Sequence, residues 1–254
     1  MPKELKNRIK AKLAEGEIAT VAGGLNTPDI IEFLGQFGFD GAFIDTEHGV
    51  PGWDDIANMS RACDVWGMTS VVRVTDNVSW LISRTLDVGA QAIVVPHVNT
   101  ADEARAIVRS AKYFPVGARG SGGGRLSYGI TDYIGKANEE TLLVALLEEQ
   151  SAIHNLDEIL KVDGIDVFFP GPGDLAQSMG YPGRSDHPEV QAVIDKAIAQ
   201  ITAAGKVAGA VVTAETAQSY ARKGARFFMS FWLPWLAKGA RDLQGEIAAF
   251  GREG

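Results

Sequence analysis

The sequence lacks several features that would assign it to particular protein classes. It contains one cysteine, Cys63, so no disulfide can form within the chain, which is typical of a reducing cytoplasm. No apolar run approaches the roughly 18 residues of a membrane-spanning helix, and the charged N-terminal segment does not resemble a signal peptide. A net charge of −8 without a basic stripe argues against nucleic-acid binding. We therefore expect a cytoplasmic protein that binds neither membranes nor nucleic acids.

Short apolar runs bounded by glycine or proline alternate with longer segments of helical periodicity. No dinucleotide-type glycine fingerprint follows the first run, which argues against an open doubly wound sheet. Eight such repeats within 254 residues favour a (β/α)8 TIM barrel that occupies residues 1–254 as a single domain. The predicted strands cover residues 18–22, 41–45, 69–74, 92–96, 142–148, 165–169, 207–212 and 226–230.

A Gly-rich segment at residues 113–125, followed by a polar stretch to about Glu140, interrupts this alternation before the fifth strand. Long insertions of this kind in compact domains usually have a function. We interpret the segment as a substrate lid or as an arm that reaches a neighbouring subunit.

Reactive side chains follow the ends of four predicted strands: Asp45 and His48, Arg73, Glu148 and Glu149, and Asp174. Catalytic groups of barrel enzymes lie at these ends, so we expect one shared active-site mouth. Glu148 and Asp174 suit a hard divalent cation such as Mg²⁺ or Mn²⁺, although each could instead cap a helix. Glu149 competes with Glu148, because alternate residues of a strand face the barrel axis.

His48 is a candidate general base, and a carboxylate such as Asp45 could orient its ring. His97, after the fourth strand, is its rival at the mouth. Arg73 lies in an otherwise apolar run and needs a partner such as Asp45 or Glu148. Its guanidinium could also bind a substrate carboxylate or polarise a keto oxygen.

Two residue patterns that are absent from the sequence argue against particular kinds of active site. The sequence has no HxxxH or CxxC pattern, which argues against a closed zinc site. No lysine ends a predicted strand, which disfavours a Schiff-base aldolase and favours a metal as the electron sink. The turn of Gly171, Pro172, Gly173 and Asp174 opens a helix whose N–H groups could bind the carboxylate of a 2-oxo acid.

These motifs closely resemble those of the HpcH/HpaI family of class II pyruvate aldolases. The matching strings cover residues 43–48, 71–73, 89–96, 117–120 and 164–175. The resemblance implies a barrel of the phosphoenolpyruvate/pyruvate type whose last helix is exchanged between subunits. It also implies a homohexamer built as a trimer of dimers.

The resemblance also assigns roles to individual residues. It implies that Glu148 and Asp174 bind a divalent cation (Mg²⁺, Mn²⁺ or Co²⁺, with Zn²⁺ as a further option), and it selects Glu148 over Glu149 by matching Asn155-Leu156. It implies that His48 is the base, acting through a metal-bound water with Asp45 as its partner, and that Arg73 contacts the keto oxygen. Arg119 and His97 are additional candidates for the substrate site.

The activity implied is reversible retro-aldol cleavage of a 4-hydroxy-2-oxo acid to an aldehyde and pyruvate, or an analogue such as hydroxypyruvate. Such enzymes are similar to 4-hydroxy-2-oxoheptanedioate and 2-dehydro-3-deoxyglucarate aldolases. A thioester lyase of the citrate-lyase-β or malyl-CoA type and an oxaloacetate decarboxylase are alternatives. A non-enzymatic barrel scaffold would leave the convergence of acidic and basic groups unexplained.

The chain departs from the family pattern in four places. Leu146 stands where the family usually has Gln, His97 where it often has an apolar residue, and Gly173 where it usually has Ala. Residues 229–235 also differ from the family, and the aromatic residues around them either shape the aldehyde pocket or belong to the core and a subunit interface. These departures leave the identity of the aldehyde open.

Overall fold

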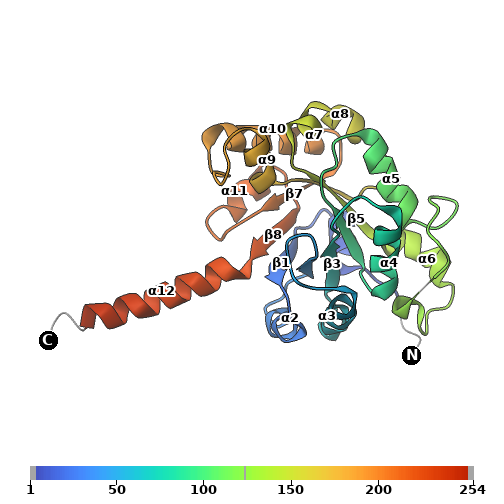
Figure 1. Ribbon diagram of the computed structural model, residues 1–254, viewed down its shortest axis with the longest axis horizontal. Helices are drawn as coiled ribbons and strands as arrows, with labels where there is room; N and C mark the ends of the chain where they lie inside the picture. The colour runs from blue at the N-terminus through green and yellow to red at the C-terminus, as the bar shows by residue number, and fades with distance from the viewer. Residues whose placement is uncertain (1–3, 123, 251–254) are drawn as a thin grey trace.

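The computed structural model describes residues 4–122 and 124–250, in which parallel strands close into a barrel in chain order (Figure 1). The predicted (β/α)8 barrel is confirmed, and β1 pairs with β8 to complete it. The strands are β1 (Ala19–Leu25), β2 (Gly41–Asp45), β3 (Thr69–Arg73), β4 (Ala92–Val95), β5 (Leu142–Leu147), β6 (Val167–Pro170), β7 (Val207–Val211) and β8 (Phe227–Phe231).

Helices cover the outside of the barrel, and local sequence signals explain where several of them begin. Thr27 caps α2 and precedes a proline, while Thr100 and Glu103 form a capping box at α5. The helices are α1 (Arg8–Ala14), α2 (Pro28–Gly35), α3 (Trp53–Val65), α4 (Ser79–Val88), α5 (Ala101–Ala111), η1 (a 3-10 turn, Arg125–Ser127), α6 (Tyr133–Glu140), α7 (Gln150–His154), α8 (Leu156–Ile159), α9 (Pro172–Ser178), α10 (Pro188–Ala203), α11 (Ala217–Arg222) and α12 (Trp232–Phe250).

The strands place alternate side chains in two separate apolar cores. In β5, for example, Leu142, Val144 and Leu146 face the barrel interior, whereas Leu143 and Ala145 face the surrounding helices. Ile9, from α1, joins the interior core. The barrel is therefore a packed scaffold, and its functional groups lie where the strands end.

The Gly-rich segment packs on the outer side of the barrel and not over its mouth. Arg125 donates to Ser60 Oγ (3.0 Å) and pairs with Asp64 (2.9 Å), both on α3. Arg119 pairs with Asp87 on α4 (2.6 Å). The interpretation of this segment as a lid is wrong for this chain, because both arginines attach it to the ends of α3 and α4 that lie far from the mouth.

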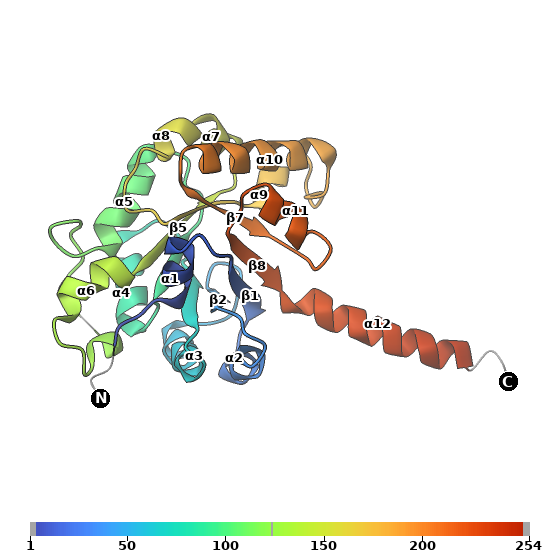
Figure 2. The same cartoon turned by 180° about the vertical axis from the view of Figure 1, so that it is seen from behind.

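Helix α12 projects away from the barrel instead of packing on it (Figures 1 and 2). None of its residues is buried, although Leu236, Leu243 and Ile247 are large and apolar. Among the helices within residues 4–122 and 124–250, none combines the length and apolarity needed to cross a bilayer.

Candidate active site

A cavity of about 360 Å³ lies at the carboxyl ends of the strands. Its lining contains His48, Arg73, Glu148 and the turn at residues 171–174, which come from four different strand ends. The structure therefore brings together the groups that the sequence predicts at a shared mouth. Asp45 lies beside this cavity through its contact with Arg73.

The register of β2 and β3 places Asp45 directly opposite Arg73. The guanidinium donates from Nε to Oδ1 (2.8 Å) and from Nη2 to Oδ2 (2.6 Å) of Asp45. Burial alone would raise the pKa of Asp45, but the hydrogen bonds and charge of Arg73 lower it below its ordinary value. Asp45 therefore stays ionised and holds Arg73 in a fixed, bidentate geometry.

Glu47 is a member of the site that the sequence analysis does not single out. Its Oε2 lies 2.9 Å from Nη1 of Arg73, and its side chain is only 10% exposed. The ring of His48 lies 4.0 Å from the same oxygen, whereas Asp45 accepts the backbone N–H of His48 (3.4 Å). The acidic neighbour of the His48 ring is thus Glu47, while Asp45 contacts Arg73 and the backbone of His48.

Glu148 is buried at the end of β5, with a side chain that is 2% exposed, while that of Glu149 is 38% exposed. Its Oε1 accepts the backbone N–H of His97 (2.8 Å). Gly171 makes room for it, since a Cβ there would lie 2.8 Å from the Cβ of Glu148. Alternation along the strand explains why Glu148, and not Glu149, enters the cavity.

The electrostatics around Glu148 favour a bound cation. Burial raises the pKa of Glu148 to about 7, and the charges of Asp174 and Glu47 act in the same direction against the opposing effect of His97. A divalent cation between Glu148 and Asp174 would relieve this repulsion. Within residues 4–122 and 124–250 no group of three or more acidic, histidine or cysteine side chains is arranged to hold a metal ion. Mg²⁺ is commonly bound through one or two carboxylates, with water and substrate oxygens in its other positions.

His97 bridges the acidic residues of the mouth. Its backbone adopts a left-handed conformation (φ 53°), which points the N–H at Glu148. Its ring Nδ1 lies 3.0 Å from Oε1 of Glu149, and Nε2 lies 3.5 Å from Oε1 of Glu47. Although partial burial lowers the pKa of His97, Glu148 and the neighbouring acids raise it above the ordinary value. His97 is therefore placed to orient carboxylates rather than to contact substrate.

Arg119 is not brought to this cavity. Its side chain is 1% exposed, pairs with Asp87 and lies over the ring of Tyr113 (4.7 Å). These contacts are on the outer side of the barrel, so Arg119 holds the Gly-rich segment in place within this chain.

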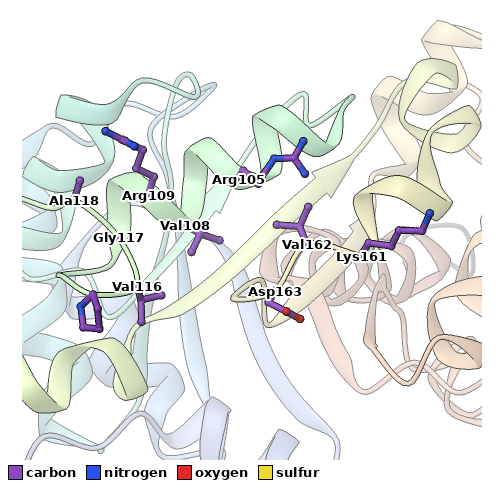
Figure 3. A pocket seen from close by; sticks show the side chains of 10 residues that line it. Arg105, Val108, Arg109, Val116, Gly117, Ala118, Lys161, Val162 and Asp163 are labelled. Carbon is purple, nitrogen blue, oxygen red and sulfur yellow. The ribbon is translucent and has the colours of Figure 1, made fainter.

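A larger cavity of about 500 Å³ lies outside the barrel, between α5, the segment at residues 115–118 and residues 161–163 (Figure 3). Arg109 and Lys161 border it but extend away from one another (Figure 3). They therefore do not converge on a single anion. The mouth cavity is the better candidate, because acids and bases converge on it.

Comparisons with known proteins agree with this geometry. A family model described as HpcH/HpaI aldolase/citrate lyase matches residues 23–231. The chain is 38% identical over 232 residues to 2-keto-3-deoxy-L-rhamnonate aldolase of Escherichia coli O17:K52:H18, covering 88% of this chain and 86% of that protein.

Solved structures show the same likeness. An HpcH/HpaI aldolase/citrate lyase family protein from Burkholderia cenocepacia J2315 is similar with a TM-score of 0.86 and 28% identity, covering 96% of this chain and 100% of that one. The citrate synthase SbnG is similar with a TM-score of 0.84 and 27% identity, over 98% of this chain and 99% of that one.

Proposed function

The chain belongs to the HpcH/HpaI aldolase/citrate lyase family, and from that premise we propose how its own residues carry out an aldol cleavage. It is a class II aldolase, a carbon–carbon lyase that reversibly cleaves a 4-hydroxy-2-oxo acid to an aldehyde and pyruvate or a pyruvate analogue such as hydroxypyruvate. The observation that carries the assignment of roles is the pair of carboxylates, Glu148 and Asp174, that faces Arg73 across one cavity.

We assign Glu148 and Asp174 as the residues that hold the divalent cation, with Mg²⁺, Mn²⁺ or Co²⁺ as the preferred ions and Zn²⁺ as a further option. The bound cation supplies a Lewis acid that stabilises the enolate. Arg73, fixed by Asp45 and Glu47, donates a hydrogen bond to the keto oxygen, where negative charge develops as the bond breaks. The first turn of α9, with Gly171, Pro172 and Gly173, borders the position proposed for the substrate carboxylate.

His48 takes the proton in this scheme. His48 accepts the proton of the C4 hydroxyl, and the C3–C4 bond breaks. The electron pair of that bond forms the enolate, while C4 becomes the carbonyl carbon of the departing aldehyde. The protonated His48 then returns this proton to C3 of the enolate, which releases pyruvate and restores the neutral ring. The ring of His48 is 65% exposed at the edge of the cavity, and its Nε2 lies 4.0 Å from Oε2 of Glu47.

Exchange of the C3 protons of pyruvate tests this mechanism without an aldehyde. In D2O, NMR should show exchange that stops after EDTA treatment and returns with Mg²⁺, Mn²⁺ or Co²⁺. His48→Asn should slow the exchange by about 10²- to 10⁴-fold, as expected for loss of a general base. His154→Asn, at an exposed position on α7, is the matched control and should exchange like the wild type. Undiminished exchange in EDTA would refute the role of the metal.

We also propose that α12 is exchanged between subunits of a homohexamer, assembled as a trimer of dimers. Helices in proteins owe most of their stability to the packing of an apolar face, yet α12 exposes Leu243 (61%) and Ile247 (57%) on this chain. Burial against a partner would stabilise it. Phe33 of α2 is also exposed and lines an apolar cavity together with Trp235 and Leu236 near the base of α12.

Charges on the apolar positions of α12 should therefore break the assembly. The double variant Leu243→Glu and Ile247→Glu should elute as smaller species in size-exclusion chromatography with light scattering, because two charges would be buried at the interface. Gln244→Glu adds a charge at an exposed polar position of the same helix and is the control. An unchanged mass for the double variant would contradict the exchange of α12.

A further inference from the structure

The mouth cavity has a charged half and an apolar half. The charged half comes from β2, β3, β5 and the turn before α9, as described above. Strands β7 and β8 contribute only apolar side chains to the lining, namely the apolar wall of Val211 at the end of β7 and Met229 and Phe231 on β8, while Ser185 adds one polar side chain from the loop after α9. If the charged half binds the 2-oxo acid, the apolar wall faces the rest of the substrate, which is the part that leaves as the aldehyde.

Phe231 is fixed in this wall by its packing. Its ring meets Phe43 edge-on with centroids 6.4 Å apart, and a Cβ on Gly23 would lie only 3.0 Å from it. The two tryptophans of residues 227–235 make contacts elsewhere. Trp232 donates to the carbonyl of Gly24, and Trp235 stacks on Phe39. Of that aromatic group, Phe231 is thus the member that shapes the cavity.

Leu146 brings an apolar group next to the proposed metal carboxylate. A Cβ placed on Gly171 would lie 3.1 Å from Oε2 of Glu148 and 3.3 Å from Cδ1 of Leu146, so these two atoms border the same point. Leu146 is 7% exposed and faces the barrel interior. Because Gly171 borders the position proposed for the substrate carboxylate, Leu146 lies beside the 2-oxo acid half of the substrate and not beside the aldehyde half.

We propose that Met229 and Phe231 restrict the aldehyde half of the substrate to short, uncharged aldehydes with an alkyl side chain. This inference rests on the aldolase function proposed above. An alkyl group gains by leaving water for this wall, whereas a carboxylate or hydroxyl loses hydration there. The volume of about 360 Å³ lies at the lower end of the range for small-molecule sites, so it favours a short chain.

Two pairs of aldehydes of matched size test the proposal in the synthetic direction with pyruvate. Propanal and glycolaldehyde differ by a methyl and a hydroxyl, and 4-methylpentanal and succinic semialdehyde differ by an isopropyl group and a carboxylate. The kcat/KM should be about 10- to 100-fold higher for the alkyl member of each pair, the range in which an apolar pocket discriminates. Equal or higher values for glycolaldehyde or succinic semialdehyde would overturn the proposal.

Variants connect the preference to named side chains. Met229→Gln places an amide in the wall and should lower the propanal-to-glycolaldehyde ratio about tenfold, whereas Met229→Leu, which conserves volume, should retain it. Phe231→Tyr adds a hydroxyl to a ring that stays packed and should lower the ratio in the same direction. Ratios that stay at the wild-type value in Met229→Gln and Phe231→Tyr would show that these residues do not set the preference.

Proton exchange at C3 of pyruvate, measured for each variant without aldehyde, tests the aldolase mechanism separately from the aldehyde specificity. Metal-dependent exchange in the wild type combined with a preference for charged aldehydes would leave the aldolase mechanism standing and refute the specificity. Absence of exchange in the metal-loaded wild type would instead refute the mechanism itself.

Discussion

Glu148→Gln should reduce retro-aldol turnover by more than about a hundredfold, because a Lewis-acid cation supplies several kcal/mol of transition-state stabilisation. The binding constant for Mn²⁺, followed by electron paramagnetic resonance, should fall with it. Glutamine keeps the shape of the side chain and can still accept the N–H of His97, so the loss would come from the missing charge.

The urea midpoint of the metal-free protein, measured at several pH values, gives a second test of Glu148→Gln. In the wild type, the pKa of Glu148 is about 7 in the native state against an ordinary value of 4.5. Between these pH values the native state holds a proton that the unfolded state has released, so stability falls as pH rises through this window. Glu148→Gln removes this titration, and its urea midpoint should fall less between pH 5 and pH 8 than that of the wild type.

Glu149→Gln is the matched control for Glu148, because Glu149 is the adjacent residue but lies outside the cavity lining. It should change the affinity for Mn²⁺ by no more than a few-fold. If Glu149→Gln lost the metal and Glu148→Gln retained it, the assignment of the metal carboxylate would be reversed.

Arg73→Lys should lower kcat/KM about 10- to 100-fold, the value of one or two hydrogen bonds to a developing charge. A lysine cannot bond to Asp45 through two nitrogens and also reach Glu47 and the keto oxygen. The loss should appear mainly in kcat, because the charge on the keto oxygen is largest in the transition state.

Arg73→Ala should in addition lower the free energy of unfolding by about 3 kcal/mol, measured by urea denaturation, since it leaves Asp45 and Glu47 buried without a cation. Arg105→Ala, which breaks an exposed pair with Asp102, is the control and should cost less than about 1 kcal/mol. A wild-type kcat for Arg73→Lys would show that the guanidinium does not act on the substrate.

The pattern of apolar runs was enough to predict the barrel, because buried parallel strands read as short β-branched segments between helices. No helix is predicted from sequence at the position of α6, which lies in the polar stretch that ends at Glu140, or at the position of α10, which lies between the sixth and seventh predicted strands. Helix α6 begins at Asp132, whose left-handed backbone (φ 54°) gives no clear sequence signal, although Asp132 caps it. Helix α10 does carry a signal, since Pro188 stands at its first turn and apolar residues recur at helical spacing.

The candidate metal pair illustrates what one sequence determines. Glu148 and Asp174 follow consecutive strands, and strand ends of a closed parallel barrel share one mouth, so their proximity follows from chain order alone. The choice between Glu148 and Glu149 needed either the family resemblance or the structure. In the structure, it is the exposure of the two side chains that separates them.

The partners of the charged groups were decided only by the tertiary structure. The register of β2 against β3 gives Arg73 both oxygens of Asp45, and Glu47 is the acidic neighbour of the His48 ring. Packing against α4 likewise removes Arg119 from the mouth, and the backbone at His97 aims its N–H at Glu148. Sequence order determines which strand ends meet, but distances of a few ångströms between side chains depend on register and packing, which no local pattern encodes. For Glu148 and Asp174, sequence therefore determined the place, and the structure supplied the burial and repulsion that favour a cation there.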